Sequence, residues 1–484
     1  MTTYSLSEKG LKQVQTALAV HNLTITKLAN NIDVSRATVN SFLQRKPVRA
    51  NKAQLIASYL QLNLSDIISA STTNEETVSI VFRQTLIRAL VQRYHTATDW
   101  FRISIMSRPQ QLSSVYIEPD QYRMSKARRG SRSILTQKAA TSILETGSFR
   151  QIEPERTPVR IKPGDHTLIV GNSGIGKTAL LKRLTQQALL SPERPTLPFL
   201  IDLDDFEAEK CALQFDVKII EQVAQLTSTT VENVEKQVIT LLQSGEIWLL
   251  LDNLDQVQNS RSIVTAIKTF ACKYPNTTIV VASRLPHFFW VESFNVVELA
   301  GFSLDQIHQF VYQWFSVRGI PEASEQFIAQ LGDCPVLQEF CTAPAMLILF
   351  VNLFEESPSI QFKDCQESWV DLALRFLIRD WDHSQGKWQP ISPLFSNDHS
   401  LSVWRQIAKQ LSPQQPLFSS KEVKAALVGY FRTKPQVTSE WIDQINSDEF
   451  VTMTQLRTGL IEERYSDLYS FRFWELQQLL AEAD

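Results

Sequence analysis

A phosphate-binding loop motif occupies residues 171–178, directly after a short apolar segment. The residues Gly-Asn-Ser-Gly-Ile-Gly-Lys-Thr match the pattern G-x-x-x-x-G-K-[ST], and Thr167 to Val170 before them form a strand-like apolar run. Ala179 to Leu184 then show the apolar spacing of a helix, whose N-terminus adds partial positive charge beside a bound anion. Because strand, loop and helix follow one another in the required order, we predict that a polyphosphate binds here.

Each position of the motif has an expected task. The glycines let the backbone curl until its N–H groups converge on the phosphates, and the loop as a whole comprises Gly171, Asn172, Ser173, Gly174, Ile175, Gly176, Lys177 and Thr178. Lys177 should reach the terminal phosphates of ATP or ADP, and the Thr178 hydroxyl should bind Mg²⁺. The alternative is a glycine-rich turn that matches by chance.

Length and composition fit a multidomain globular protein. The chain has 484 residues, enough for about three domains, and no run approaches the ~18 apolar residues of a membrane span. The first twelve residues are polar and lack a signal-peptide core. The five cysteines and seven histidines show no metal-ligand spacing. We therefore expect a cytoplasmic protein with reduced thiols and no membrane partner.

Positive charge is concentrated in the first third of the chain. Residues 1–70 hold eight Lys/Arg and three Asp/Glu, and residues 71–150 hold twelve and six, although the whole chain has a net charge of −3. A basic front on an acidic body suggests that the front contacts a polyanion, and ordinary surface variation is the alternative.

Residues 7–68 divide into four helical patterns. Apolar residues mark a helix at about Ser7 to His21 (Leu11, Val14, Leu18, Val20), one after Thr24, one over Arg36 to Gln44 and one at about Asn51 to Leu62 (Leu55, Ile56, Leu60). Thr24 and Ser35 are suitable N-caps. In the third helix, Val39 and Phe42 should face inward.

The string from Thr24 to Leu43 resembles the helix-turn-helix of Cro-like phage repressors. Ala29 stands where that family needs a small residue, and Val34-Ser35 match its turn and cap. Two positions depart from the family, since Ile25 replaces a polar amide and Asp33 replaces the glycine of the turn. The resemblance implies that the helix starting at Ser35 enters the major groove of DNA.

Candidate DNA contacts follow from this placement. Arg36, Thr38 and Asn40 leave the third helix on the face away from Val39 and Phe42, so they are candidates for base contacts. Ser35, Arg45, Lys46 and Arg49 are better placed for phosphates. A helical module that binds protein partners and no DNA is the alternative.

The region that follows is less informative. Ser69 to Glu76 is polar and turn-like, which suggests a linker, and Val78 to Tyr94 has apolar residues at helical spacing, including Val81, Leu86 and Leu90. Lys126 to Arg132 is a basic loop that either is solvated or adds phosphate contacts.

After the phosphate loop, strand patterns alternate with helical ones. Strands are expected at Leu197–Leu203, Ile247–Leu251, Thr278–Ala282 and Val296–Leu299, which predicts a mainly parallel sheet with helices on both faces. Asp252, at the tip of the second of these strands, can hold Mg²⁺ together with Thr178, unless it only caps a helix. Asp255 can orient the attacking water, or be a cap or a surface acid. Arg284 can sense the γ-phosphate, or form a surface ion pair.

These motifs together resemble the NACHT branch of the STAND signal-transduction NTPases. The phosphate loop, Leu-Leu-Leu-Asp252-Asn-Leu-Asp255-Gln and Ala-Ser-Arg284 match its motifs in order and spacing, and Gly301-Phe-Ser matches the segment after its fifth strand. The resemblance implies that Pro344 packs near the adenine, whereas an ordinary helix-start proline is the alternative. It also implies a winged-helix end after Leu456, in which Phe473 stands where the family has a phosphate-contacting histidine, and Gln256 stands where it has a glutamate.

The expected architecture is therefore multidomain, α and α/β. It has an all-α helix-turn-helix domain (1–70), a helical linker region (71–150), a phosphate-loop NTPase domain (151–302), a helical domain (303–400) and a winged-helix-like domain (401–484). The resemblance implies an ATP/ADP switch with slow hydrolysis, self-association in the ATP state and a protein trigger. A transcription regulator is the first hypothesis, and a defence or signalling NTPase whose head recruits proteins is the second.

Overall fold

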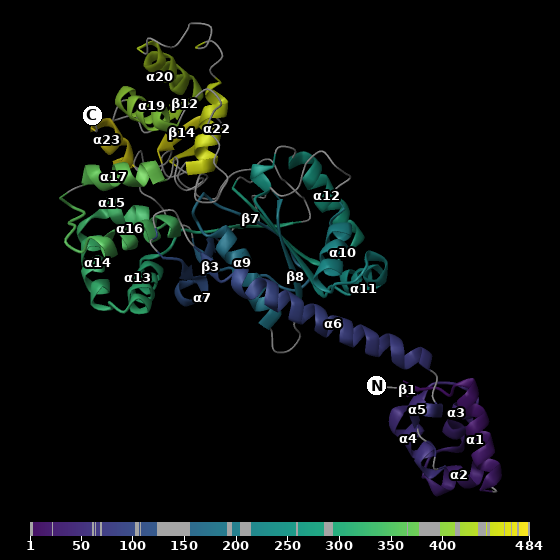
Figure 1. Cartoon of the computed structure of the whole chain (residues 1–484). Coiled ribbons are helices and arrows are strands. Elements are labelled where there is room, and N and C mark those ends of the chain that lie inside the picture. Colours follow the sequence, from purple (N-terminus) through teal and green to yellow (C-terminus); the bar gives the residue numbers. More distant parts are fainter. Residues whose placement is uncertain are drawn as a thin grey trace. The chain divides into compact units, whose positions relative to one another are not determined.

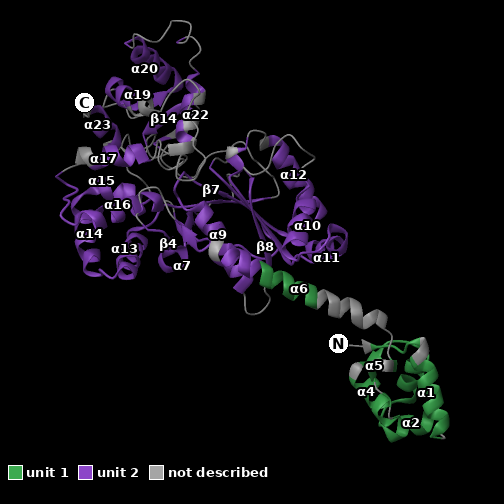
Figure 2. Ribbon diagram, viewed as in Figure 1, with its two compact units in different colours: residues 1–89 green, residues 90–484 purple. Residues whose placement is uncertain are grey.

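The structure is a computed structural model that divides into two compact units, residues 1–89 and 90–484 (Figure 2). The residues that it describes are 3–21, 23–60, 62, 64–67, 70–101, 106, 108–122, 155–190, 196–203, 214–257, 260–284, 294–364, 366–376, 397–411, 417–433, 442, 446–458, 460–465, 467–471 and 474–482. The finer domain boundaries expected from the sequence remain predictions.

The first unit is a small helical domain with a short β-ribbon. Its helices are α1 (Glu8–Val20), α2 (Ile25–Asn31), α3 (Arg36–Leu43), α4 (Ala50–Tyr59) and α5 (Leu64–Ile67), and β1 (Thr3–Tyr4) pairs antiparallel with β2 (Val48–Arg49). The side chains of Ser7, Thr24 and Ser35 accept hydrogen bonds from the first turns of α1, α2 and α3, respectively. The N-caps predicted at Thr24 and Ser35 are confirmed.

The core of this unit contains most of the apolar residues that the helical spacing selected. Val14, Leu28, Val39 and Phe42 are all fully buried. Val20 and Leu55, which also marked the helical spacing, are exposed.

Asp33 takes over the role of the glycine in the helix-turn-helix turn. Its φ angle is 52°, in the left-handed region that favours glycine, and Asp is one of the few other residues that tolerate it. The Val34 N–H then donates to the Ala29 carbonyl at 3.0 Å, which closes the turn. The departure at Asp33 therefore leaves the backbone of the motif unchanged.

Helix α6 (Ala70–Ala97) includes residues 70–76, so the turn-like linker expected there is wrong. Leu86 and Leu90 are buried as expected from their spacing, but Val81 is exposed. After α6, β3 (Trp100–Phe101) pairs with β4 (Gln110–Gln111), α7 (Leu112–Val115) follows, and β5 (Asp120–Tyr122) pairs with β6 (Arg156–Pro158).

A five-stranded parallel sheet forms the centre of the second unit (Figure 1). The strands lie in the order β11 (Asn295–Glu298), β7 (His166–Val170), β10 (Thr278–Ser283), β9 (Ile247–Asp252) and β8 (Leu197–Asp202). Helix α9 (Lys177–Leu190) packs on one face, where its leucines meet Ile169, Leu250 and Val280. Helices α10 (Phe215–Leu226), α11 (Val231–Gln243) and α12 (Ser260–Lys273) complete the connections. The predicted parallel sheet is confirmed.

The chain then becomes mainly helical. Helices α13 (Leu304–Arg318), α14 (Glu322–Asp333), α15 (Pro335–Cys341), α16 (Pro344–Glu356) and α17 (Gln366–Arg375) come first. They are followed by α19 (Asn397–Gln410), β12 (Phe418–Ser419), α20 (Ser420–Arg432), α22 (Ser447–Thr458), β13 (Ile461–Tyr465), β14 (Leu468–Phe471) and α23 (Trp474–Glu482). Strands β12, β14 and β13 form a three-stranded antiparallel sheet.

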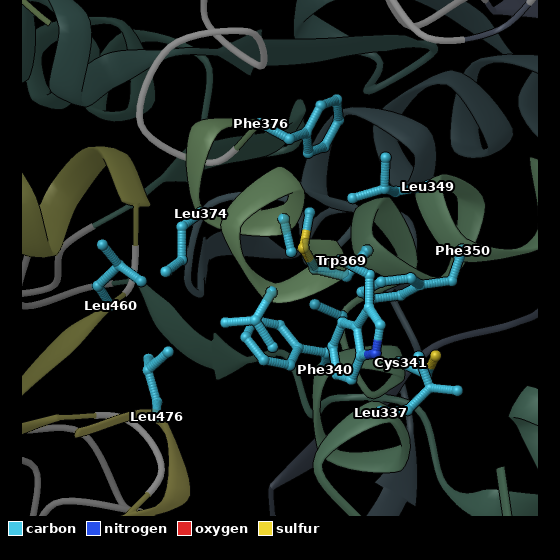
Figure 3. Close-up of a cluster of buried hydrophobic side chains, with 14 of the residues drawn as sticks. Leu337, Phe340, Cys341, Leu349, Phe350, Trp369, Leu374, Phe376, Leu460 and Leu476 are labelled. Atoms are coloured by element: carbon cyan, nitrogen blue, oxygen red, sulfur yellow. The ribbon is translucent and has the colours of Figure 1, made fainter. Parts of the chain in front are cut away.

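One cluster of buried hydrophobic side chains runs through these helices (Figure 3). Phe340, Phe350 and Trp369 meet edge to face at its centre, with ring centroids 5.2 to 6.1 Å apart. The cluster extends to Leu460 and Leu476 near the C-terminus and to residues of α13. The same core therefore supports α16, which borders the candidate site.

Candidate functional site

The phosphate loop lies between the carboxyl end of β7 and the N-terminus of α9. Gly174 and Gly176 have φ angles of 74° and 103°, which side chains rarely allow, so the loop can curl as the motif requires. Helix α9 begins at Lys177, and its first turn faces the loop. An anion in the loop would therefore meet backbone N–H groups and the positive end of a helix.

Lys177 is turned into its own loop. Its ammonium group donates to the carbonyl oxygens of Gly171 at 2.7 Å and Asn172 at 2.9 Å. Burial lowers the pKa of this group to about 8, although the carboxylates of Asp255 and Asp252 oppose the shift. A phosphate chain would give this cation the anionic partner that carbonyl oxygens only partly replace.

Thr178 and Asp252 are held together at the end of β9. The Thr178 hydroxyl donates to Asp252 Oδ2 at 2.7 Å. Burial raises the pKa of Asp252, and the charge of Asp202, its neighbour in register on β8, adds to the rise. The 3₁₀ turn after β9 is capped by Asn253, so Asp252 is not its N-cap.

The pair of Thr178 and Asp252 fits a magnesium site. Hydroxyl and carboxylate oxygens are ligands that Mg²⁺ prefers, and Mg²⁺ usually takes few protein ligands together with water and substrate phosphates. In keeping with this, no group of three or more His, Cys, Asp or Glu side chains suited to a metal is found among the described residues.

Asp255 and Arg284 form a buried ion pair. The backbone N–H of Arg284 donates to Asp255 Oδ1 at 2.7 Å, and the guanidinium Nε lies 3.5 Å from Oδ2. Their side chains are only 7% and 11% exposed, so Asp255 is not a surface acid and the pair is not a surface ion pair. The structure thus brings the two residues predicted to act in catalysis into direct contact with each other.

These residues border a cavity of about 480 Å³ that also reaches the helical region. Pro344 starts α16 and also lines this cavity, and its contact with adenine stays a prediction. Next to it, the Ala345 N–H donates to the Gly174 carbonyl at 3.1 Å. The phosphate loop is therefore joined directly to the N-terminus of α16.

The apolar side of the cavity was not predicted from the sequence. Its wall comes largely from the segment between α6 and β5, which no motif marks, and from helices α13 and α16. The residues that were missed are Trp100, Phe101, Leu112, Val115, Tyr116, Ile117, Pro119, Ala179, Lys182, Asp202, Asn253, Phe302, Phe310, Ala345 and Ile348. Asp202 could have been selected by its position at the tip of an expected strand, and Asn253 and Phe302 by the motifs that contain them.

The predicted DNA-contact residues gather around α3. Arg36, Asn40, Lys46 and Arg49 are exposed. Ser35 and Thr38 also stabilise the start of α3. Ser35 caps the helix by accepting a hydrogen bond from the Thr38 N–H, and the two hydroxyl groups lie 2.8 Å apart.

Arg45 also has a structural task. Its φ angle is 60°, and its guanidinium Nε donates to the Leu6 carbonyl at 3.2 Å, which ties the end of α3 to the N-terminal segment. Its remaining N–H groups can still face a phosphate, because the residue is exposed.

Two family models match the chain. One describes the NACHT domain and matches residues 165–318, and the other describes the Cro/C1-type helix-turn-helix DNA-binding domain and matches residues 14–72. The chain carries a NACHT domain behind a Cro/C1-type helix-turn-helix domain. No curated protein matches the chain.

The solved structures that are similar to this chain are distant. A Walker-type ATPase of Pyrococcus abyssi is 14% identical, with 65% of this chain and 90% of that chain covered and a TM-score of 0.38. A STAND protein with a tetratricopeptide repeat sensor from Pyrococcus horikoshii is 12% identical, with 75% and 43% covered and a TM-score of 0.24. The Orc1 protein of Aeropyrum pernix, solved with DNA, is 12% identical, with 71% and 89% covered and a TM-score of 0.29.

Three features named in the sequence analysis have no described side chains. Phe473 and the basic loop Lys126 to Arg132 lie outside the described residues, and only the backbone of Gln256 is described.

Over the described residues, no helix is both long and apolar enough to cross a membrane.

Proposed function

We propose that the chain is a nucleotide-gated transcription regulator, in which ATP and Mg²⁺ bind the NACHT domain and control the DNA-binding head. Hydrolysis would be slow and would reset the switch. Self-association in the ATP state and a protein trigger belong to the same proposal.

The observation that carries the proposal is that the phosphate loop and the helical region line the same cavity. Phosphate-loop residues line one part and Pro344 and Ala345 of α16 line another, with the Ala345 N–H bonded to the Gly174 carbonyl. A nucleotide in this cavity would contact the sheet and the helical region at once. Occupancy can therefore favour one arrangement of the two over another, which is the requirement for a ligand-driven switch.

The site residues have assigned roles in this proposal. Lys177 exchanges its carbonyl partners for phosphate oxygens, and Thr178 and Asp252 hold the metal. Mg²⁺, when bound, would offset the negative charge of the phosphates. To contact the γ-phosphate, Arg284 would loosen its 3.5 Å pair with Asp255, and Asp255 Oδ2 could then accept a hydrogen bond from a water molecule. Slow hydrolysis agrees with the pairing of the Asp255 carboxylate to Arg284, since a paired carboxylate is less available to orient water.

In the head, the proposal assigns base contacts to Arg36, Thr38 and Asn40. Arg45, Lys46 and Arg49, with the hydroxyl of Ser35, would bind phosphates. The net positive charge of residues 1–70 supports this assignment.

A second candidate function is a defence or signalling NTPase whose head recruits proteins. Leu55 and Tyr59 favour it, since these apolar side chains lie one turn apart on α4 and are 44% and 41% exposed. Such a pair offers a surface for another protein.

Fluorescence anisotropy with a labelled fragment of the gene's own promoter tests the first proposal. Binding would be measured without nucleotide, with ADP and with a slowly hydrolysed ATP analogue, across a salt series. Affinity that exceeds that for random duplex, falls with salt and differs between nucleotide states is expected. Equal affinity for promoter and random duplex in every state would favour the protein-recruiting alternative.

Variants separate the two halves of the proposal. Lys177→Ala should abolish ATP binding, and retained affinity would remove the site assignment. Arg36→Ala should weaken promoter binding about fivefold or more and leave ATP affinity unchanged. Lys12→Ala, an exposed charge on α1, is the matched control and should change little.

A further inference from the structure

Two carboxylates lie at the tips of the neighbouring parallel strands β8 and β9. Asp202 of β8 is paired in register with Asp252 of β9. Neighbouring strands are about 4.8 Å apart, and side chains paired in this way lie on the same face of the sheet. Both residues line the cavity, as does Thr178. Two carboxylates this close repel each other, so a cation beside them would be favoured.

Asn253 holds the two carboxylates in a fixed arrangement. Its backbone N–H donates to Asp252 Oδ1 at 2.9 Å, and its side-chain amide donates to Asp202 Oδ1 at 3.0 Å. Its φ angle is 63°, in the left-handed region, which Asn adopts more readily than most other residues. The residue after Asp252 therefore also orients Asp202.

Two cations could account for a carboxylate at position 202. Mg²⁺ in a nucleotide site is typically held by one or two carboxylates together with phosphates and water, so Asp202 suits it as the second carboxylate. The other cation is Lys182, which lies one turn after Thr178 on α9 and lines the same cavity. If Asp202 only balanced Lys182, loss of its charge would tighten the binding of a polyphosphate with or without a metal.

We propose that Asp202 is a further residue of the magnesium site, where it acts together with Thr178 and Asp252, and that Asn253 positions its carboxylate. This inference rests on the proposed binding of ATP and Mg²⁺. It adds to the site a strand that carries no recognised motif.

The test compares wild type with Asp202→Asn, which keeps the oxygen that accepts from Asn253 and removes the charge. Calorimetry measures ATP affinity across a Mg²⁺ series that starts in EDTA. Asp333→Asn, which changes an exposed carboxylate of α14, is the matched control. Thermal unfolding of the nucleotide-free proteins shows whether each variant is folded.

For Asp202→Asn, the Mg²⁺ concentration needed for half-maximal ATP binding should rise about tenfold, because a carboxylate that supports the ion has been lost. In EDTA, ATP should bind about two- to threefold more tightly, because a negative charge near the phosphates has been removed. The control should change neither value.

A second variant tests the positioning role. Asn253→Gly tolerates the same φ angle and keeps the backbone N–H that donates to Asp252, but it lacks the amide that orients Asp202. It should raise the Mg²⁺ requirement by less than Asp202→Asn does, and it should leave ATP affinity in EDTA unchanged because the charge is retained.

Three results would overturn the proposal. They are an unchanged Mg²⁺ requirement in a folded Asp202→Asn variant, an equal change in ATP affinity with and without Mg²⁺, and a wild-type ATP affinity that does not depend on Mg²⁺. The second result would assign Asp202 to Lys182 or to the general charge of the cavity. If wild type binds ATP at no Mg²⁺ concentration, the proposed nucleotide binding itself fails.

Discussion

Binding of a triphosphate should add a proton to Lys177 above pH 8. Burial lowers the pKa of this ammonium group to about 8 in the nucleotide-free chain. An adjacent polyphosphate favours the charged form and should return the pKa toward its ordinary value of about 10.4. At pH 9 the free site then holds about 0.1 proton and the complex about 1, so that about 0.9 proton is taken up; at pH 7 the uptake is about 0.1.

Calorimetry of ATP binding at pH 9, in two buffers with different ionisation enthalpies, measures this uptake. ATP affinity should also fall by about sevenfold per pH unit between pH 8.5 and 10. Lys177→Arg keeps a cation that does not titrate in this range, so the uptake should disappear. Burial also lowers the pKa of Lys182, which lines the cavity, so Lys182→Arg is the control and should retain the uptake. An uptake near zero in wild type, or one that persists in Lys177→Arg, would refute the reasoning.

Three further predictions concern stability. In the nucleotide-free chain, the folded state holds the Lys177 proton more weakly than the unfolded state does. The free energy of unfolding should therefore rise between pH 8 and 10.4, by at most about 3 kcal/mol. Denaturant titrations measure this rise, which should be absent in Lys177→Arg. Gly174→Ala should destabilise the second unit by about 1–3 kcal/mol and weaken ATP binding at least tenfold. The reasons are the φ angle of 74° at Gly174 and the new Cβ, which would lie 2.8 Å from Ala345 Cβ. Gly176→Ala is the control for backbone strain without a clash, because Gly176 has a φ angle of 103° but no atom within 4 Å of the Cβ that alanine would add. Gly10→Ala should destabilise the first unit by about 3 kcal/mol, and so lower its unfolding temperature, because the new Cβ would lie 1.8 Å from the Ile67 carbonyl oxygen. ATP affinity should stay unchanged. Gly332→Ala, in a helix with open space around it, is the control and should be neutral or stabilising. An unchanged melting profile for Gly174→Ala or Gly10→Ala would contradict the packing described for that glycine.

Local signals in the sequence were sufficient for much of the fold. Each strand of the parallel sheet was found within two residues of its ends, because buried parallel strands are continuous apolar runs. The caps at Thr24 and Ser35 followed from side-chain chemistry. The spacing of the phosphate loop likewise placed Lys177 and Thr178 where the structure has them, next to Asp252.

Features that depend on contacts between residues far apart in the chain could not be predicted from the sequence. Spacing selects one face of a helix but not its width, so it could not show that Val20 and Leu55 are exposed. Residues 70–76 are polar and turn-like in composition, yet they continue α6. Much of the apolar wall of the cavity comes from Trp100, Phe101 and residues 112–117, where the two-residue strands and the four-residue helix have no period long enough to recognise.

The two ends of the cavity suggest how such a switch would discriminate between ADP and ATP. At the apolar end, the cavity wall would meet the same base in either nucleotide, so it contributes affinity but no discrimination. At the other end, Lys177 has carbonyl partners and Arg284 pairs with Asp255, and both arrangements must change for a γ-phosphate to be accepted. A ligand shifts an equilibrium only by its difference in affinity for the two states, so the discrimination must come from these residues. The bond from the Ala345 N–H to the Gly174 carbonyl then gives the helical region a direct contact with the loop whose charges change.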